Sequence, residues 1–182
     1  MNALVRLTGA KTVANTALRW IPLFLPTLER AFGASTTQLT TVIGAGELAG
    51  FSTIASGARL DRGRERVVMV SSLGLVAASS VIALGGSVAS FAVSFFVLVL
   101  GVANFTVAGQ AWISHRVPYG QRARSLGLFE TSWAVALLIG LALPLLLGAA
   151  AFELWTQWQT GLRPHQHSYG AVVYTVIVIQ DC

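Results

Sequence analysis

Charged residues are scarce in this chain of 182 residues. Asp, Glu, Lys and Arg together make up 10% of the sequence, whereas hydrophobic residues make up 54% and the mean hydropathy is +0.69. An ordinary soluble domain carries about 25% charged residues. The shortage of charge therefore excludes a typical soluble domain and predicts a membrane protein.

Cysteine and catalytic motifs are also sparse. Cys182 is the single cysteine, so the sequence excludes a disulfide within the chain. Outside the apolar stretches there is no Ser-His-Asp set, no pair of carboxylates and no phosphate-binding loop. The sequence therefore predicts neither an enzyme nor a bound cofactor.

Two short motifs are better explained without a ligand. The glycine spacing of 44–49 formally fits a dinucleotide-binding fingerprint, but no strand precedes it. Close packing of membrane helices at Gly46 and Gly50 explains that spacing better. His165 and His167 supply only two metal ligands, which is too few to predict a metal site.

Positive charge is concentrated in a few places. Seven of the twelve Lys and Arg residues lie in the segments 59–66 and 114–124, and the net charge is +5. Basic residues grouped between apolar stretches are typical of cytoplasmic loops and not of a nucleic-acid-binding face. We therefore expect no nucleic-acid partner, and we place the N-terminus and both basic segments in the cytoplasm. The excess of Arg over a single Lys, with abundant Ala and Gly, favours a bacterial inner membrane.

Apolar stretches long enough to cross a bilayer, about twenty residues each, recur along the chain. We expect five membrane helices, with the approximate bounds 12–32, 38–58, 67–86, 91–113 and 125–150. Pro22 and Pro26 fall inside the first of them and should bend it.

The pattern changes after residue 152. The remaining residues, 153–182, contain one mainly apolar run, 171–179, which at nine residues is too short to span as a helix. We expect a non-spanning, flexible tail over 153–182. The chain is either truncated or altered near residue 153, as a frameshift would do, or it has a naturally short tail.

The ten residues 57–66 resemble the signature loop between helices 2 and 3 of the major facilitator superfamily of secondary transporters. The matching residues are Gly57, Leu60, Asp61, Arg62, Gly63, Arg64 and Arg66, with two spacings shorter than the family has. The resemblance covers about 7–152. It implies an all-α membrane protein, a bundle of five transmembrane helices resembling an incomplete six-helix half of a major facilitator transporter.

The resemblance also implies a function. That function is secondary transport of a small organic solute by alternating access, with or without a coupling ion, by a full-length transporter that has a second six-helix half and sits in the lipid bilayer. In the family the signature loop latches the two halves together; the latch residues here would be Gly57, Asp61, Arg62, Gly63, Arg64 and Arg66. The alternative for these arginines is a role in topology and in contact with anionic lipid. The alternative for the whole chain is a non-transporting membrane fragment or a pseudogene product.

Ionisable side chains inside a bilayer are costly and therefore mark candidate sites. Arg19 and Glu47 lie at depths that differ by about 6 Å, at 1.5 Å per helical residue. We expect them to contact each other and to face a water-filled cavity that binds a substrate or a proton. They can instead form a purely structural ion pair, or Arg19 can extend to the interface. Glu130 is a third candidate, or else an interfacial residue at a helix start.

Polar and aromatic residues of the fourth and fifth expected helices complete the candidate set. Asn104 and Gln110 make the fourth helix polar, and the resemblance places that helix beside the central cavity. Asn104 is a candidate for contact with substrate, although a hydrogen bond between helices explains it equally. Trp133 is a candidate cavity residue or a packing residue.

Overall fold

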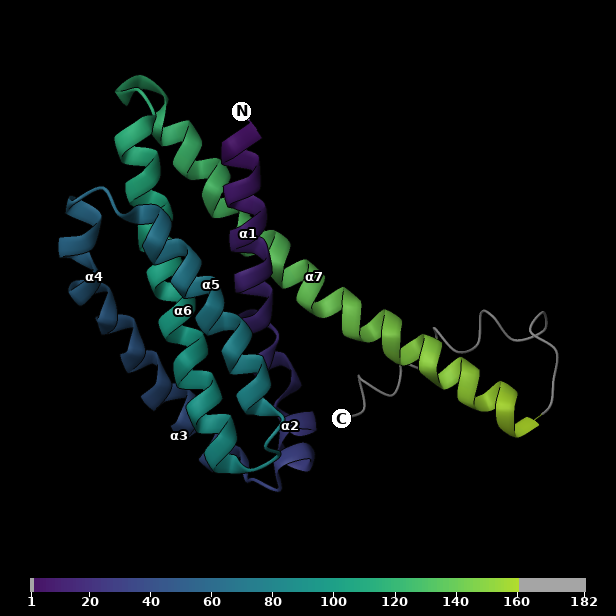
Figure 1. Ribbon diagram of the computed structural model, residues 1–182. Helices are drawn as coiled ribbons and strands as arrows, with labels where there is room; N and C mark the ends of the chain where they lie inside the picture. The colour runs from purple at the N-terminus through teal and green to yellow at the C-terminus, as the bar shows by residue number, and fades with distance from the viewer. Residues whose placement is uncertain (1, 161–182) are drawn as a thin grey trace. The chain divides into compact units, whose positions relative to one another are not determined.

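A computed structural model describes residues 2–160, which are helical almost throughout and contain no strand in that range (Figure 1). The chain divides into two units, 1–137 and 138–182. In chain order the elements are α1 (Asn2–Arg19), the 3-10 helix η1 (Ile21–Phe24), α2 (Leu25–Phe32), α3 (Thr36–Gly46), the 3-10 helix η2 (Glu47–Phe51), α4 (Ser52–Asp61), α5 (Glu65–Ala83), α6 (Val88–Arg116) and α7 (Tyr119–Thr160). The predicted all-α class is confirmed.

The first two expected helices are each interrupted. The first begins already at Asn2 and gives way to η1 after Trp20, where Pro22 cannot donate the backbone hydrogen bond of an α-helix. The second comprises α3, η2 and α4, and its 3-10 segment follows Gly46 and contains Gly50, residues of low helix propensity. In the described range, the continuous helices long and apolar enough to cross a membrane are α5, α6 and α7 as far as Ala151.

Local signals explain where several helices begin. Ser35 and Ser87 each cap the next helix with a capping box. Their hydroxyls accept from the backbone amides of Gln38 and Ser90, and the side chains of Gln38 and Ser90 accept from the backbone amides of Ser35 and Ser87.

The turn between α4 and α5 is tight. Gly63 adopts a left-handed conformation there, with φ of 69°, which other residues rarely accept.

The last helix is longer than expected. We expected it over 125–150, but α7 runs from Tyr119 to Thr160, because Pro118 suits a helix start and no Gly or Pro interrupts 149–160. The first eight residues of the expected tail, 153–160, are therefore helical. The prediction for 161–182 lies outside the described residues.

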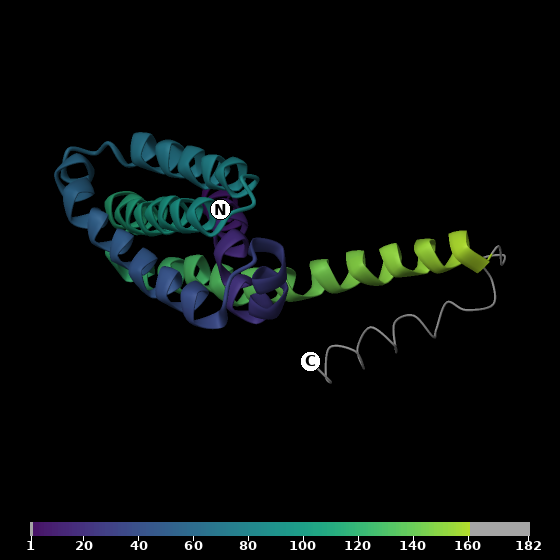
Figure 2. The ribbon, with the colours of Figure 1, turned by 90° about the horizontal axis from the view of Figure 1, so that it is seen from below.

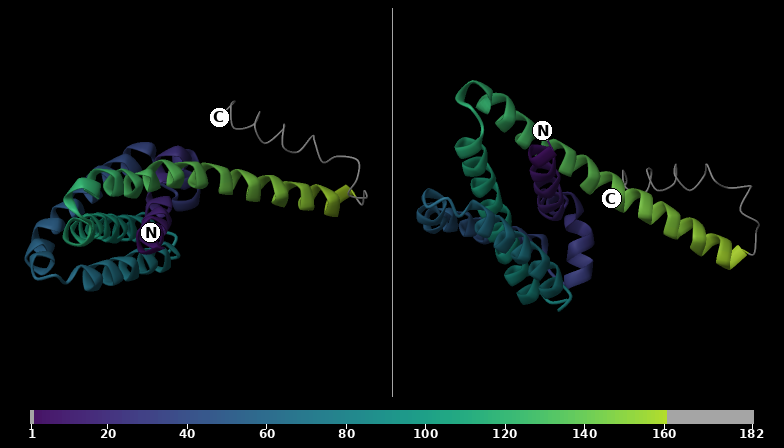
Figure 3. Two further views of the ribbon diagram at one scale, coloured as in Figure 1. Left: turned by 90° about the horizontal axis from the view of Figure 1, so that it is seen from above. Right: turned by 45° about the horizontal axis from the view of Figure 1, so that its top comes forward.

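Helix α6 is the central element of the first unit. It contacts α1, α3, η2, α4 and α5, and Figure 2 shows it lying among these neighbours. Helix α1 lies beside α6 (Figure 3), and residues of both helices belong to one apolar core. In that core the rings of Phe32, Phe91 and Phe95 follow one another with centroid separations of 5.1 and 6.1 Å.

Helices α5 and α6 share an extensive contact, and a glycine allows their close approach. A Cβ added to Gly101 of α6 would lie 2.8 Å from the backbone oxygen of Ser72 and 3.0 Å from a methyl group of Val76. The hydroxyl of Ser94 in α6 donates to the backbone oxygen of Ser79 in α5 at 2.8 Å. Such contacts between small residues are what hold membrane helices together, because lipid provides no hydrophobic drive.

We predict that Gly101→Ala lowers the free energy of unfolding by about 1–3 kcal/mol, because the new methyl group meets the α5 backbone, which cannot move aside cheaply. The matched control is Gly74→Ala in α5, where nothing lies within 4 Å of the added Cβ. It should leave stability unchanged or raise it by up to about 1 kcal/mol through helix propensity. Unfolding of both variants in detergent micelles measures the difference; equal stabilities would contradict the packing argument.

Candidate functional site

Four charged side chains from distant parts of the sequence line one cavity of about 460 Å³ in the first unit. They come from α1, η2 and the first part of α7. Polar, small and apolar residues of α1, η2, α4, α6 and α7 complete the lining. The residues that matter chemically are Lys11, Asn15, Arg19, Glu47, Thr53, Thr106, Glu130 and Trp133.

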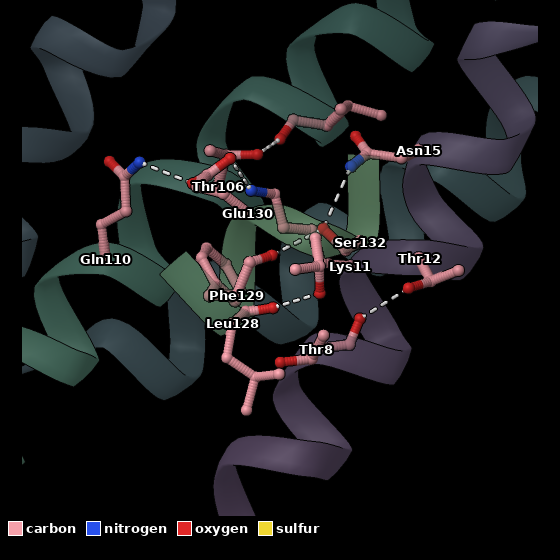
Figure 4. Close-up of polar contacts among 12 residues, drawn as sticks. Thr8, Lys11, Thr12, Asn15, Thr106, Gln110, Leu128, Phe129, Glu130 and Ser132 are labelled. Atoms are coloured by element: carbon pink, nitrogen blue, oxygen red, sulfur yellow. Dashed lines mark hydrogen bonds and ion pairs between the residues drawn. The ribbon is translucent and has the colours of Figure 1, made fainter. Parts of the chain in front are cut away.

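The best-defined contact of this cavity is an ion pair between Lys11 and Glu130. The Lys11 Nζ lies 2.7 Å from Glu130 Oε2; the lysine side chain is 3% exposed and the glutamate side chain 47%. Gln110 of α6 donates its amide to the other carboxylate oxygen at 3.1 Å. The Lys11 ammonium also lies 4.1 Å from the centroid of the Phe129 ring. Figure 4 shows how these side chains join α1, α6 and α7.

One helical turn further along α1, a second polar contact reaches α7. The Asn15 amide donates to the Ser132 hydroxyl at 3.5 Å, which is a long hydrogen bond. Ser132 in turn donates to the backbone oxygen of Phe129 at 2.7 Å. Asn15 and Ser132 are 2% and 0% exposed, so this contact belongs to the packed wall of the cavity (Figure 4).

Arg19 occupies the next turn of α1 and stacks on an aromatic ring. Its guanidinium carbon lies 4.5 Å from the centroid of Trp133, and its Nε is buried without a hydrogen-bond partner. We expected Arg19 to form an ion pair with Glu47. That expectation is wrong: no such pair occurs within 4.0 Å among residues 2–160, although both side chains line the same cavity. The two groups reach the same cavity but do not come within ion-pairing distance of each other.

Lys11 was missed as a site residue because the first helix was expected to begin after it. The helix begins at Asn2, so Lys11 lies in its middle. The signal was present in the sequence: Lys11, Asn15 and Arg19 are spaced by four and therefore share one helix face. Their common face is the one that lines the cavity.

Asn104 lies apart from this cavity. It is 6% exposed and its amide donates to Ser52 of α4 at 2.7 Å, while its side-chain oxygen accepts from Ser56. It is absent from the cavity lining, so the hydrogen bond between helices is the arrangement found. Gln110 is likewise not a lining residue, but it reaches the site through Glu130.

The signature-loop residues form the exposed end of α4 and the turn into α5. Asp61, Arg62, Gly63, Arg64 and Arg66 are exposed, and in the part of the chain that is described none of their charged groups is in an ion pair. Gly57 is half-buried, and a Cβ added there would meet nothing within 4 Å. The contacts made within this chain therefore leave the loop free on its outer side.

A second charged cluster, which the sequence analysis did not identify, lies beside the signature loop. Glu65 is 1% exposed; its Oε1 lies 2.5 Å from His115 Nδ1 and 3.4 Å from Arg116 Nη1. The cluster ties the start of α5 to the end of α6. Over residues 2–160 no group of three His, Cys, Asp or Glu side chains is arranged to hold a metal ion.

We predict that the Lys11–Glu130 pair couples the stability of α1 to that of α7. In a double-mutant cycle with Lys11→Met and Glu130→Gln, the coupling free energy should be about 1–2 kcal/mol, because each single change leaves one charge without its partner. The half-exposed carboxylate keeps this value below that of a fully buried pair.

The control cycle combines Lys11→Met with Glu47→Gln. Glu47 lines the same cavity but is in no ion pair within residues 2–160. That cycle should be additive within about 0.5 kcal/mol. Unfolding in mixed micelles provides the four free energies of each cycle. Additive losses for Lys11 and Glu130 would show that the two side chains act independently.

Comparison with known proteins identifies the family. The sequence profile of the Major Facilitator Superfamily matches residues 9–161. The uncharacterized MFS-type transporter YwfA of Bacillus subtilis is 30% identical over 93 residues, a match that covers 47% of this chain and 23% of that protein. No solved structure matches the chain significantly. Since the profile match covers most of the chain, and the described residues form helices of which several are apolar enough to span a membrane, the chain belongs to the Major Facilitator Superfamily.

Proposed function

We propose that this chain acts as part of a longer secondary transporter, which moves a small organic solute across the membrane by alternating access. The observation that carries the proposal is the convergence of Lys11, Arg19, Glu47 and Glu130 on one cavity among membrane helices. Ionisable groups in a membrane bundle characteristically mark a substrate or ion pathway. The cavity volume of about 460 Å³ suits a small molecule.

The cavity residues divide into two groups by their contacts. Arg19 and Glu47 face the cavity without an ion-pair partner in the described range, so we assign them to the polar groups of the solute. Trp133 provides a flat apolar surface beside Arg19. Lys11, Gln110 and Glu130 already satisfy one another, so we assign them to coupling: protonation of Glu130 would weaken the contact between α1 and α7.

The signature loop has a separate role in this proposal. Its exposed residues Asp61, Arg62 and Arg64, and the open space beside Gly57, are available to a second six-helix half, which they would latch in one state of the transport cycle. Facilitator sites lie between two such halves. The matched segment is 23% of the length of YwfA, which supports a longer functional chain. We expect no transport by these 182 residues alone.

The transport proposal predicts loss of uptake when the cavity charges are changed. The longest reading frame that contains this chain is purified, reconstituted in liposomes and tested with labelled carboxylates, amino acids and sugars. Arg19→Gln and Glu47→Gln should each lower uptake of the accepted solute at least tenfold, the equivalent of about 1.4 kcal/mol of lost interaction. Arg30→Gln, whose residue does not line the cavity, is the control and should transport normally.

Two outcomes of the same assay would contradict the transport proposal. Undiminished uptake by Arg19→Gln and Glu47→Gln would remove the cavity from the transport pathway. Absence of uptake for every class of solute, by a reading frame that folds and is monodisperse, would favour the non-transporting membrane fragment.

The orientation is a further part of the proposal, with the N-terminus and both basic segments in the cytoplasm. In a Cys182→Ser background, Ser87→Cys in the turn between α5 and α6 should react with an impermeant thiol reagent added outside cells. Arg124→Cys, at an exposed position of the second basic segment, should react only after the membrane is permeabilised. The reverse labelling pattern would invert the topology.

A further inference from the structure

A second, larger cavity lies at the end of the bundle that carries the signature loop. Its volume is about 840 Å³, and its lining comes from the first turns of α1, the start of α5 and the cytoplasmic-loop end of α6. None of its lining residues belongs to the cavity of Arg19 and Glu47. The proposed solute site does not include it, although Arg66 is also one of the latch residues of the signature loop.

Three arginines converge on this second cavity: Arg6 from α1, Arg66 from α5 and Arg116 from α6. No acidic residue is in its lining. Arg116 is partly neutralised by Glu65, 3.4 Å away, but Arg6 and Arg66 are in no ion pair within residues 2–160. All three are exposed, so the positive charge is available to a ligand from outside the protein.

The remaining lining residues are apolar. They include Leu7, Met69, Phe105 and Trp112, and the Arg116 guanidinium lies 5.3 Å from the centroid of the Trp112 ring. The wall thus offers little to the hydrogen-bonding groups of a water-soluble anion. It suits a molecule that has an anionic head and a hydrocarbon body.

We propose that this cavity binds an anionic phospholipid, with the phosphate among Arg6, Arg66 and Arg116 and an acyl chain along the apolar wall. Guanidinium groups match the geometry of phosphate oxygens. Basic pockets between membrane helices are sites for acidic headgroups on the cytoplasmic side. The charge complementarity selects an acidic lipid over a zwitterionic one, and the apolar wall selects a lipid over free phosphate.

The bound lipid would join three elements at once. It would bridge the starts of α1 and α5 and the end of α6, next to the Glu65 cluster that already connects α5 to α6. Its headgroup would offset part of the basic charge that gathers at this end of the bundle. The site therefore predicts a preference for acidic lipid that is independent of any transported solute.

Native mass spectrometry of the purified 182-residue chain tests the proposal, with phosphatidylglycerol and phosphatidylethanolamine as probes. Phosphatidylglycerol should bind more tightly, and Arg6→Gln/Arg66→Gln should weaken its binding about 30-fold, as expected for removing two basic side chains from an acidic lipid. The matched control is Arg59→Gln/Arg124→Gln, which removes two exposed arginines outside the cavity lining and should bind normally.

Arg6→Lys/Arg66→Lys keeps the charge and should retain binding within a few-fold, so it separates loss of charge from loss of folding. Equal weakening by the two glutamine doubles would show that net charge, and not this cavity, attracts the lipid. Equal binding of the two lipids would overturn the proposal, as would displacement of phosphatidylglycerol by inorganic phosphate.

Discussion

A lysine ammonium buried in a membrane bundle has to be neutralised within reach of its own side chain, and this requirement organises much of the first unit. Lys11 meets Glu130 at 2.7 Å and lies over the ring of Phe129. The position of that ring depends on Gly109 of α6, where a Cβ would come within 2.4 Å of it. Charge neutralisation and close packing thus fix the same three helices, α1, α6 and α7, at one level.

Two further neighbours of α6 are held by different kinds of contact. Toward α5 the backbones approach each other at Gly101. Toward α4 the contact is polar, because Asn104 exchanges hydrogen bonds with Ser52 and Ser56. Both solutions avoid reliance on a hydrophobic drive that lipid does not supply. The cavity is lined by residues of α1, η2, α4, α6 and α7.

The sequence predicted the parts of this arrangement that depend on hydropathy and on backbone chemistry. Five helical stretches and the interruption near Pro22 follow from apolar run length and a missing amide hydrogen. Polar or aromatic side chains within the expected membrane helices marked four candidates, Arg19, Glu47, Glu130 and Trp133. All four line one cavity. Their functional role stays a prediction.

What could not be predicted is which side chains meet. Residue counting gives the depth of a group but not the distance between two side chains that face the same cavity, so Arg19 was paired with Glu47, whereas the ion pair of the cavity is that of Lys11 and Glu130. The start of α1 was placed too late, which made Lys11 look like a loop residue. The Glu65 cluster was missed because the sequence analysis of the loop considered only its arginines. Glu65 pairs with His115 and Arg116, which lie far away in the sequence, and the fold alone brings the end of α6 beside the start of α5.

The 3-10 segment η2 has a geometrical consequence for the helix that contains it. A 3-10 helix turns about 120° per residue and an α-helix about 100°, so five residues of η2 advance the following chain by about 100° more. In an unbroken α-helix Leu39 and Ser56 would point about 100° apart. The overwound segment removes that difference, and both residues are buried on the side of α6. The short 3-10 segment therefore changes the helical pitch just enough that α3 and α4 bury the same side of the interrupted helix against α6.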